Sequence, residues 1–262
     1  MLGWSINLFR VFGIQLAIHA SFVVLIAYWA WSGYSESGWS GAGMHLALGV
    51  SFFICVILHE LGHSLTARRY GVKVPRILLM PIGGMAEMDR IPRQPRAEFL
   101  ITIAGPAVNF AIALLLLPVV WPLFSFRDDG LYVAVGGYWP MLLWANLVMG
   151  TFNLLPVFPM DGGRIFRAAL ASRLPYLQAT WWAVTVGKVL ALAGAGLMAV
   201  YFENWLGAVL FVFIYFAADA EYRFTLRREQ EAAYWAQLAK QAQALGFGTD
   251  ETPRLTDFHG RN

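Results

Sequence analysis

Long apolar stretches constrain this chain more than any other feature of its sequence. A helix needs roughly 20 largely apolar residues to cross a hydrocarbon core about 30 Å thick. Charged residues make up only 13% of the chain, against about a quarter in ordinary soluble domains. We therefore expect an all-α polytopic membrane protein with about six transmembrane helices. The six apolar stretches are 14–31, 44–66, 99–121, 138–157, 178–200 and 201–218.

The positions of the basic residues indicate how these stretches are oriented, because Lys and Arg accumulate in cytoplasmic loops. With the N-terminus in the cytoplasm, seventeen of the nineteen basic residues fall on the cytoplasmic side. The other two are Arg127, which falls outside, and Lys188, which lies within the fifth stretch. The excess of Arg over Lys, sixteen to three, favours a prokaryotic source. We expect a multi-pass protein of a prokaryotic inner membrane with both termini in the cytoplasm.

The spacing of the basic residues also bears on partners. A nucleic-acid binder gathers its basic residues into a patch or stripe, whereas here the apolar stretches separate the basic clusters. The expected surroundings are therefore a lipid bilayer, and no nucleic-acid partner is expected. Nothing in the sequence predicts an oligomeric state.

Residues 71–95 are typical neither of a span nor of a plain loop. Two β-leaning runs, 72–80 and 85–88, flank the pair Gly83 and Gly84, which predicts a β-hairpin. The alternation of residues 12–19 predicts a further strand before the first helix. We therefore add a small membrane-associated β-hairpin or sheet to the helical fold.

The composition changes near the C-terminal end. Residues 219–245 are polar and rich in Ala, Glu and Gln, which predicts a short cytoplasmic helix, and residues 246–262 are expected to be loose. The predicted organisation is a six-span domain over residues 1–222, followed by a cytoplasmic helix and flexible tail over residues 223–262.

The second apolar stretch contains the pattern His-Glu-x-x-His at His59, Glu60 and His63. On a helix, two histidines four residues apart project from one face, with a spacing that suits two imidazoles sharing one Zn²⁺. Glu60 lies beside that face, where it can take a proton from a metal-bound water. The alternative is a pair of buried histidines satisfied by polar neighbours, but ionisable groups inside a membrane are costly and indicate function.

Asp161 is the candidate for a third ligand, because a catalytic zinc site has three protein ligands and one open position. It follows the fourth stretch, which by the predicted topology ends on the same side of the membrane as His63. Pro156 and Pro159 interrupt a regular helix there, so a short carboxylate can turn toward the metal. The alternative for Asp161 is an N-cap of a short helix over residues 162–171.

These motifs resemble those of the site-2 proteases, a family of zinc metalloproteases that cut inside the membrane. The pattern around His59 matches the family's zinc motif, and Asn153-x-x-Pro156 followed by Asp161-Gly162 matches its second signature. Gly105-Pro106-x-x-Asn109 is a further match. The resemblance implies one Zn²⁺ bound by His59, His63 and Asp161, general-base catalysis by Glu60, and substrate contacts from Asn153.

The resemblance has limits. No PDZ-sized insertion separates the spans, and the roughly 40 residues after the sixth stretch are too few for paired CBS domains. We therefore expect a minimal six-span member of the family. Its substrates would be membrane-bound regulators, such as anti-sigma factors or transcription-factor precursors, or remnant signal peptides.

Four residues are candidates for substrate binding. A strand edge at Gly83 and Gly84 is able to pair with an extended substrate, although the two glycines also suit a simple turn. Asn109 is expected either to face the active-site cavity or to bond between helices. For Asn153, a hydrogen bond at the end of its own helix is the alternative to substrate binding.

The expected function is hydrolysis of a peptide bond in or near the transmembrane segment of a protein, by metal-activated water with Glu60 as general base. The alternative is a non-catalytic, metal-dependent protein that binds membrane helices.

Overall fold

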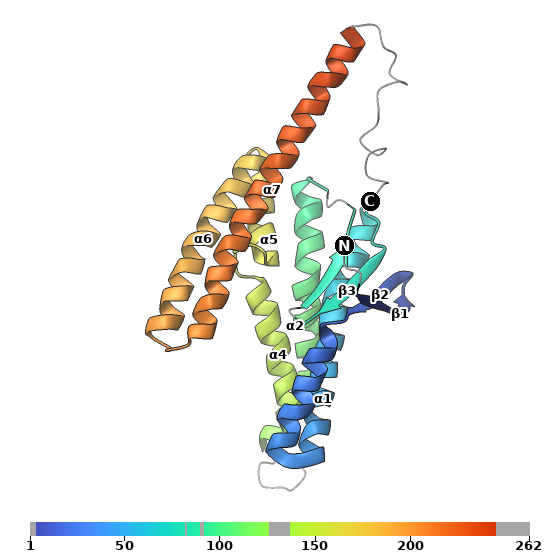
Figure 1. Cartoon of the computed structure of the whole chain (residues 1–262), viewed down its shortest axis with the longest axis vertical. Coiled ribbons are helices and arrows are strands. Elements are labelled where there is room, and N and C mark those ends of the chain that lie inside the picture. The colour runs from blue at the N-terminus through green and yellow to red at the C-terminus, as the bar shows by residue number, and fades with distance from the viewer. Residues whose placement is uncertain (1–3, 82, 90–91, 126–136, 245–262) are drawn as a thin grey trace.

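The computed structural model describes residues 4–81, 83–89, 92–125 and 137–244 and is mostly helical, with one small sheet (Figure 1). The strands are β1 (Ser5–Val11), β2 (Ile14–His19), β3 (Arg76–Met80) and β4 (Gly83–Glu87). The helices are α1 (Phe22–Arg69), α2 (Pro95–Ser125), α4 (Tyr138–Asn153), α5 (Asp161–Ala171), α6 (Tyr176–Val200) and α7 (Trp205–Ala244).

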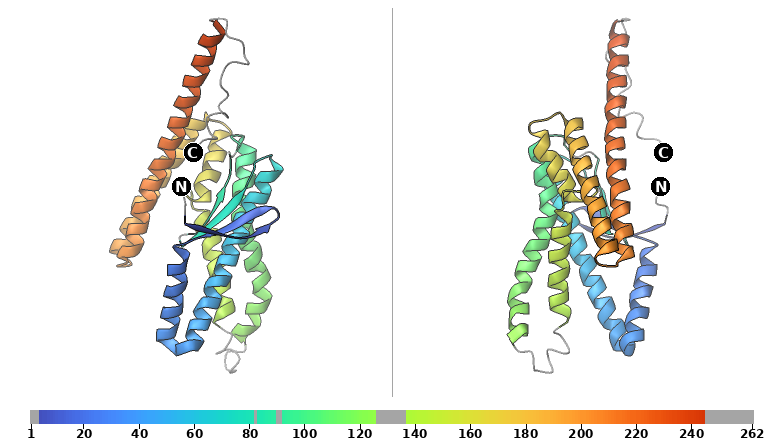
Figure 2. Two further views of the ribbon diagram at one scale, coloured as in Figure 1. Left: turned by 45° about the vertical axis from the view of Figure 1, so that its right-hand side comes forward. Right: turned by 90° about the vertical axis from the view of Figure 1, so that its left-hand side faces the viewer.

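Within the described residues, four helices are long and apolar enough to cross a membrane, namely α1, α2, α6 and α7. Helix α1 bends at Ser37 and Gly38 and folds back on itself as two arms (Figure 2). The arms meet at Gly33 and Gly41, where a Cβ on Gly33 would lie 2.3 Å from the Gly41 carbonyl oxygen. Helix α4 has 16 residues, fewer than a perpendicular span requires. The predicted count of six spans is therefore not confirmed.

Some predicted boundaries differ from the structure. The first predicted span began at residue 14, but residues 14–19 form strand β2 and the helix begins at Phe22. Helix α7 runs from Trp205 to Ala244 and includes residues 222 and 223, so the predicted domain boundary falls within it and stays a prediction. Residues 246–262, predicted to be loose, lie outside the described part of the chain.

The sheet has the order β1-β2-β3-β4, so β1 and β4 are its edges. Strand β2 pairs antiparallel with β1 and parallel with β3, and β3 pairs antiparallel with β4. This confirms the predicted hairpin and the predicted strand within residues 12–19. Gly83 and Gly84 form the beginning of β4, where Gly83 has a φ of 137°, a conformation that favours glycine.

The sheet is anchored on the C-terminal arm of α1. Ile14, Leu16 and Ile77 from the strands pack in one buried cluster with Leu61 of α1 and Ile101 of α2. An isolated hairpin is marginally stable in water. The shared apolar cluster therefore explains how this small sheet of short strands is stabilised, because it packs against helices α1 and α2. It also holds β4 beside the His-Glu-x-x-His segment.

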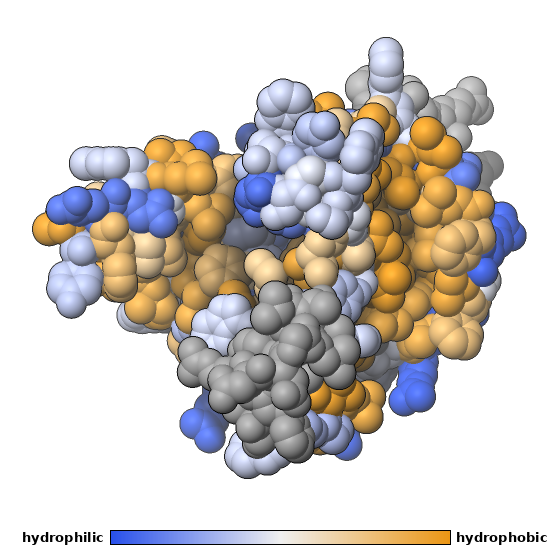
Figure 3. Space-filling view, turned by 90° about the horizontal axis from the view of Figure 1, so that it is seen from below, coloured by the Kyte–Doolittle hydropathy of each residue, from blue (hydrophilic) through white to orange (hydrophobic). Residues whose placement is uncertain are grey.

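The remaining helices form two groups. Helices α1, α2 and α4 pack together, and α6 and α7 form an antiparallel pair joined by the short connection between Val200 and Trp205 (Figures 1 and 2). Short helix α5 packs against both α2 and α6. Apolar side chains cover much of the outer surface seen from below (Figure 3), as expected for helices that face lipid. Strongly exposed examples are Leu115, Trp121, Trp144, Trp205 and Leu206.

Candidate metal centre

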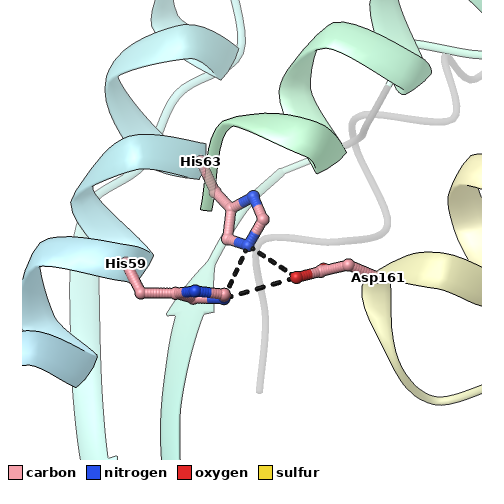
Figure 4. Close-up of side chains that lie close together, drawn as sticks. All are labelled: His59, His63 and Asp161. Atoms are coloured by element: carbon pink, nitrogen blue, oxygen red, sulfur yellow. Dashed lines mark hydrogen bonds and ion pairs between the residues drawn. The ribbon is translucent and has the colours of Figure 1, made fainter. Parts of the chain in front are cut away.

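Two imidazoles and one carboxylate meet at a single point (Figure 4). His59 and His63 project from the C-terminal arm of α1, and Asp161 is the first residue of α5. Asp161 Oδ2 lies 3.3 Å from His59 Nε2 and 3.1 Å from His63 Nε2, and the two Nε2 atoms are 3.1 Å apart. The three side chains identified from sequence therefore offer their ligand atoms to one position.

The break between α4 and α5 brings Asp161 to this position. Helix α4 ends at Asn153, and the chain turns through Pro156 and Pro159 before α5 begins. The N-cap residue of α5 is Met160, and no side chain caps the helix. Asp161 therefore does not act as the N-cap, which was the alternative interpretation. The Asp161 carboxylate is instead directed at the two histidines (Figure 4).

The surroundings of Asp161 favour its ionised form. Burial opposes a charge on the carboxyl group, but the adjacent imidazoles of His59 and His63 outweigh burial and hold the pKa of Asp161 well below its usual value. A carboxylate ionised at neutral pH is the form that binds a metal.

Gly105 of α2 lies against both histidines. A Cβ at residue 105 would stand 2.2 Å from His63 Nε2 and 2.8 Å from His59 Nε2, so any larger residue would displace the two ligand atoms. The nitrogen at the far side of the His63 ring, Nδ1, donates to the Ile101 carbonyl at 2.8 Å, which leaves Nε2 for a metal. Two imidazoles, a carboxylate and a glycine that makes room for them fit a zinc ion.

The centre lies in the wall of a cavity of about 940 Å³. Glu60, Asn153 and the continuous run of residues 84–89 line this cavity together with the three ligand residues. Gly84 lies so close to Glu60 that a Cβ at residue 84 would be 2.6 Å from Glu60 Cγ. The cavity therefore has the metal centre, the Glu60 carboxylate and residues 84–87 of β4 in its wall.

Three predicted substrate-binding residues occupy different surroundings. Asn153 lines the cavity, and its Nδ2 also donates to the Met149 carbonyl of its own helix at 3.1 Å. Gly83 begins the strand that lines the cavity. Asn109 is fully buried between helices and is hydrogen-bonded to His59 Nδ1. Asn109 thus has the interhelical contacts that were its alternative interpretation.

A cluster of charged residues that was not predicted from the sequence connects helix α5 with helices α2 and α7 beside the metal centre. Arg167 of α5 donates from Nε to Glu98 of α2 at 2.9 Å and from Nη1 to Glu221 of α7 at 2.9 Å. Burial disfavours its charge, but Glu98, Tyr176 and Glu221 raise the pKa of Arg167. The cluster links the helix that carries Asp161 to the helix whose Ile101 carbonyl holds His63.

Comparison with known proteins agrees with this geometry. The model of peptidase family M50 matches residues 47–127 and 129–194, more than half of the chain. The chain belongs to peptidase family M50. This match includes all three metal-centre residues and Glu60. It also confirms the resemblance to the site-2 proteases inferred from the motifs.

Individual members of family M50 are similar over most of the chain. A zinc metalloprotease of Methanocaldococcus jannaschii is 40% identical over 222 residues, which cover 85% of this chain and 62% of that protein. The protein Rip3 of Mycobacterium tuberculosis is 31% identical over 243 residues, covering 87% of this chain and 58% of Rip3. This chain therefore spans about three fifths of the length of these two relatives.

A solved structure also matches. The site-2 protease from Methanocaldococcus jannaschii superimposes with a TM-score of 0.58 at 39% sequence identity. The superposition covers 84% of this chain and 95% of that structure. The chain thus shares its fold with a solved site-2 protease and its sequence with a protein named as a zinc metalloprotease.

Proposed function

We propose that this chain is an intramembrane zinc endopeptidase, which cleaves a peptide bond in or near the transmembrane segment of a membrane protein. The observation that carries this proposal is the convergence of His59, His63 and Asp161 beside Glu60 in the wall of one cavity. Two of these ligands lie in a helix that is long and apolar enough to cross a membrane. Costly ionisable groups at such a place are typical of a functional site.

Glu60 is the proposed general base. A zinc ion held by the two histidines and Asp161 would polarise the substrate carbonyl and make a water acidic enough to lose a proton near neutral pH. The Glu60 carboxylate, in the same cavity wall, accepts the proton of the attacking water and returns it to the leaving amine. Asn153 is the proposed donor to the substrate or to the developing oxyanion.

The proposed substrate is held as an extended strand. The peptide bonds of a helix are occupied by its own hydrogen bonds, so a transmembrane helix must unwind before it is cut. Strand β4 has no strand on its other side within the described residues, and residues 84–89 line the cavity. An unwound segment that adds to this edge would receive main-chain hydrogen bonds close to Glu60. Gly83 and Gly84 permit the strand to begin there.

Gly84→Val is expected to reduce cleavage by at least about tenfold, because the added side chain would push on Glu60 and Val56 and misplace the reacting groups. Zinc content should not change, since the atoms nearest to a Cβ at residue 84 belong to Glu60 and Val56 and not to the three ligand residues. The matched control is Met85→Val on the same strand, whose side chain is 40% exposed. Equal cleavage rates for Gly84→Val, Met85→Val and the wild type would contradict the proposed need for a glycine beside Glu60.

The proposed location is a prokaryotic inner membrane, with the N- and C-termini in the cytoplasm. Supporting this orientation, seventeen of nineteen basic residues fall on the predicted cytoplasmic side. His59 precedes Arg68 by nine residues, so it would lie about 14 Å from that boundary along the helix. Water and product would therefore exchange on the cytoplasmic side.

The proposed substrates are anti-sigma factors, transcription-factor precursors or remnant signal peptides. The test is hydrolysis of such transmembrane segments by the purified chain in liposomes, with zinc present and after its removal by a chelator. Zinc-dependent turnover of a segment would support the proposal. Capture of segments without turnover would favour the alternative, a metal-dependent protein that binds membrane helices.

A further inference from the structure

We propose that Asn109 is a positioning residue that, together with Asn146, sets the tautomer of His59 so that its Nε2 is free to bind the metal. This inference rests on the proposed zinc site. Asn109 belongs to α2 and Asn146 to α4, and both side chains are fully buried. Burying two side-chain amides costs free energy unless each polar atom has a hydrogen-bond partner. Here every side-chain polar atom of Asn109 and Asn146 has one.

The direction of these hydrogen bonds follows from one backbone carbonyl. The Leu142 oxygen can only accept, so the Asn146 atom 2.9 Å away is the amide nitrogen Nδ2, which also lies 3.3 Å from Cys55 Sγ. The Asn146 oxygen therefore faces Asn109 and accepts from its Nδ2 at 3.1 Å. This arrangement leaves the Asn109 oxygen as the group that faces His59.

The Asn109 oxygen determines which imidazole nitrogen carries the proton. It lies 2.6 Å from His59 Nδ1, and because it is an acceptor, Nδ1 must donate. A neutral imidazole carries one proton, so its Nε2 then has a free lone pair, directed at the point shared with His63 and Asp161. His63 receives the same constraint from the Ile101 carbonyl. The support of His63 is backbone, whereas that of His59 is a side chain and is open to mutation.

The choice of an amide also suits the charge of the site. A carboxylate at residue 109 would add a third acid to a region that already holds the half-buried Glu60 and Asp161. An amide accepts from His59 without adding charge, and its own donor is anchored on a second helix. Helix α4 is thereby coupled to a metal ligand on α1, although α4 contributes no ligand itself.

The test is the zinc affinity of the purified full chain in detergent, measured by competition with a chelator of known affinity. Asn109→Leu is expected to weaken zinc binding about 10- to 100-fold, as loss of such supporting partners does. Asn109→Asp keeps an acceptor toward His59 but adds a charge and loses the donor to Asn146, so it should bind zinc more tightly than Asn109→Leu does. The visible spectrum of the cobalt-loaded protein should likewise change more in Asn109→Leu than in Asn109→Asp.

The control is Thr180→Val, which removes a buried hydrogen bond to the Tyr176 carbonyl within α6. Its zinc affinity should equal that of the wild type even if its melting temperature falls. Should Asn109→Leu not fold, Asn146→Leu replaces it, because it frees the Asn109 amide to rotate and should also weaken zinc binding. Zinc affinity equal to the wild type in a folded Asn109→Leu, or in Asn146→Leu, overturns the proposal. Absence of zinc binding by the wild type would instead refute the proposed function.

Discussion

Glu60→Gln is expected to abolish cleavage while the zinc content stays at the wild-type level. Glutamine has nearly the same size but cannot accept a proton at neutral pH, and a general base contributes about 10²- to 10⁴-fold to such a rate. The carboxylate is not among the three ligand groups, so the metal should remain bound. Initial cleavage rates in liposomes and zinc content per chain, measured on the same preparations, give both quantities.

The matched control for this experiment is Glu87→Gln. Glu87 is another acid in the wall of the same cavity, but it is paired with Arg76 at 2.6 Å on the adjacent strand. We expect its removal to change the rate far less than Glu60→Gln does. Cleavage by Glu60→Gln at the wild-type rate would contradict the role proposed for Glu60.

Gly105→Ala is expected to weaken zinc binding by about 100-fold or more, beyond the loss typical of one supporting partner. A single methyl group would occupy space within 2.2 Å of His63 Nε2 and 2.8 Å of His59 Nε2. Because the obstruction comes from helix backbone, the histidines must move, and the three ligand atoms would then no longer converge. Chelator competition on the purified variant measures this effect.

Gly196→Ala is the control for Gly105→Ala. It makes the same substitution in helix α6, where nothing lies within 4 Å of the added Cβ. Its zinc affinity should match that of the wild type. Zinc binding by Gly105→Ala as tight as that of Gly196→Ala would mean that the ligand geometry described above is not the one that binds the metal.

Much of the metal centre was predictable because it depends on local chemistry. The histidines at i and i+4 share a helix face whatever surrounds that helix, and the two prolines before Asp161 end a helix by their covalent structure. The meeting of Asp161 with the histidines followed from the direction of the spans. What Gly105 contributes was not predictable, because its closeness to the histidines depends on how α2 packs against α1.

The parts of the fold that were missed depend on contacts distant in sequence. Strand β1 was not predicted: its side chains are mostly exposed, and its alternation of polar and apolar residues breaks after Leu8, where the pairing with β2 is irregular. One local signal for it was available. The residues Phe12 and Gly13 both have positive φ and join β1 to β2, and a Gly-containing two-residue turn is typical of a β-hairpin. The first predicted span was begun at residue 14 instead of Phe22 because β2 is itself apolar and largely buried.

The buried polar contacts were also beyond the sequence. Asn109 and Asn146 are 37 residues apart, and each resembles an ordinary polar residue in an apolar stretch. Arg167 and Glu98 are 69 residues apart in the sequence, and only the packing of α5 against α2 brings their side chains into contact. The motif containing Asn109 drew attention to that residue, but only the structure places it next to His59.

The most direct test of the central claim is the mass of the fragments released when the zinc-loaded wild type acts on a transmembrane segment in liposomes. Fragment masses give the position of the cut. We predict a cut within or next to the membrane-spanning part of the segment, lost on chelation and restored by zinc. A cut confined to residues far from the membrane, or turnover that persists without zinc, would contradict the account.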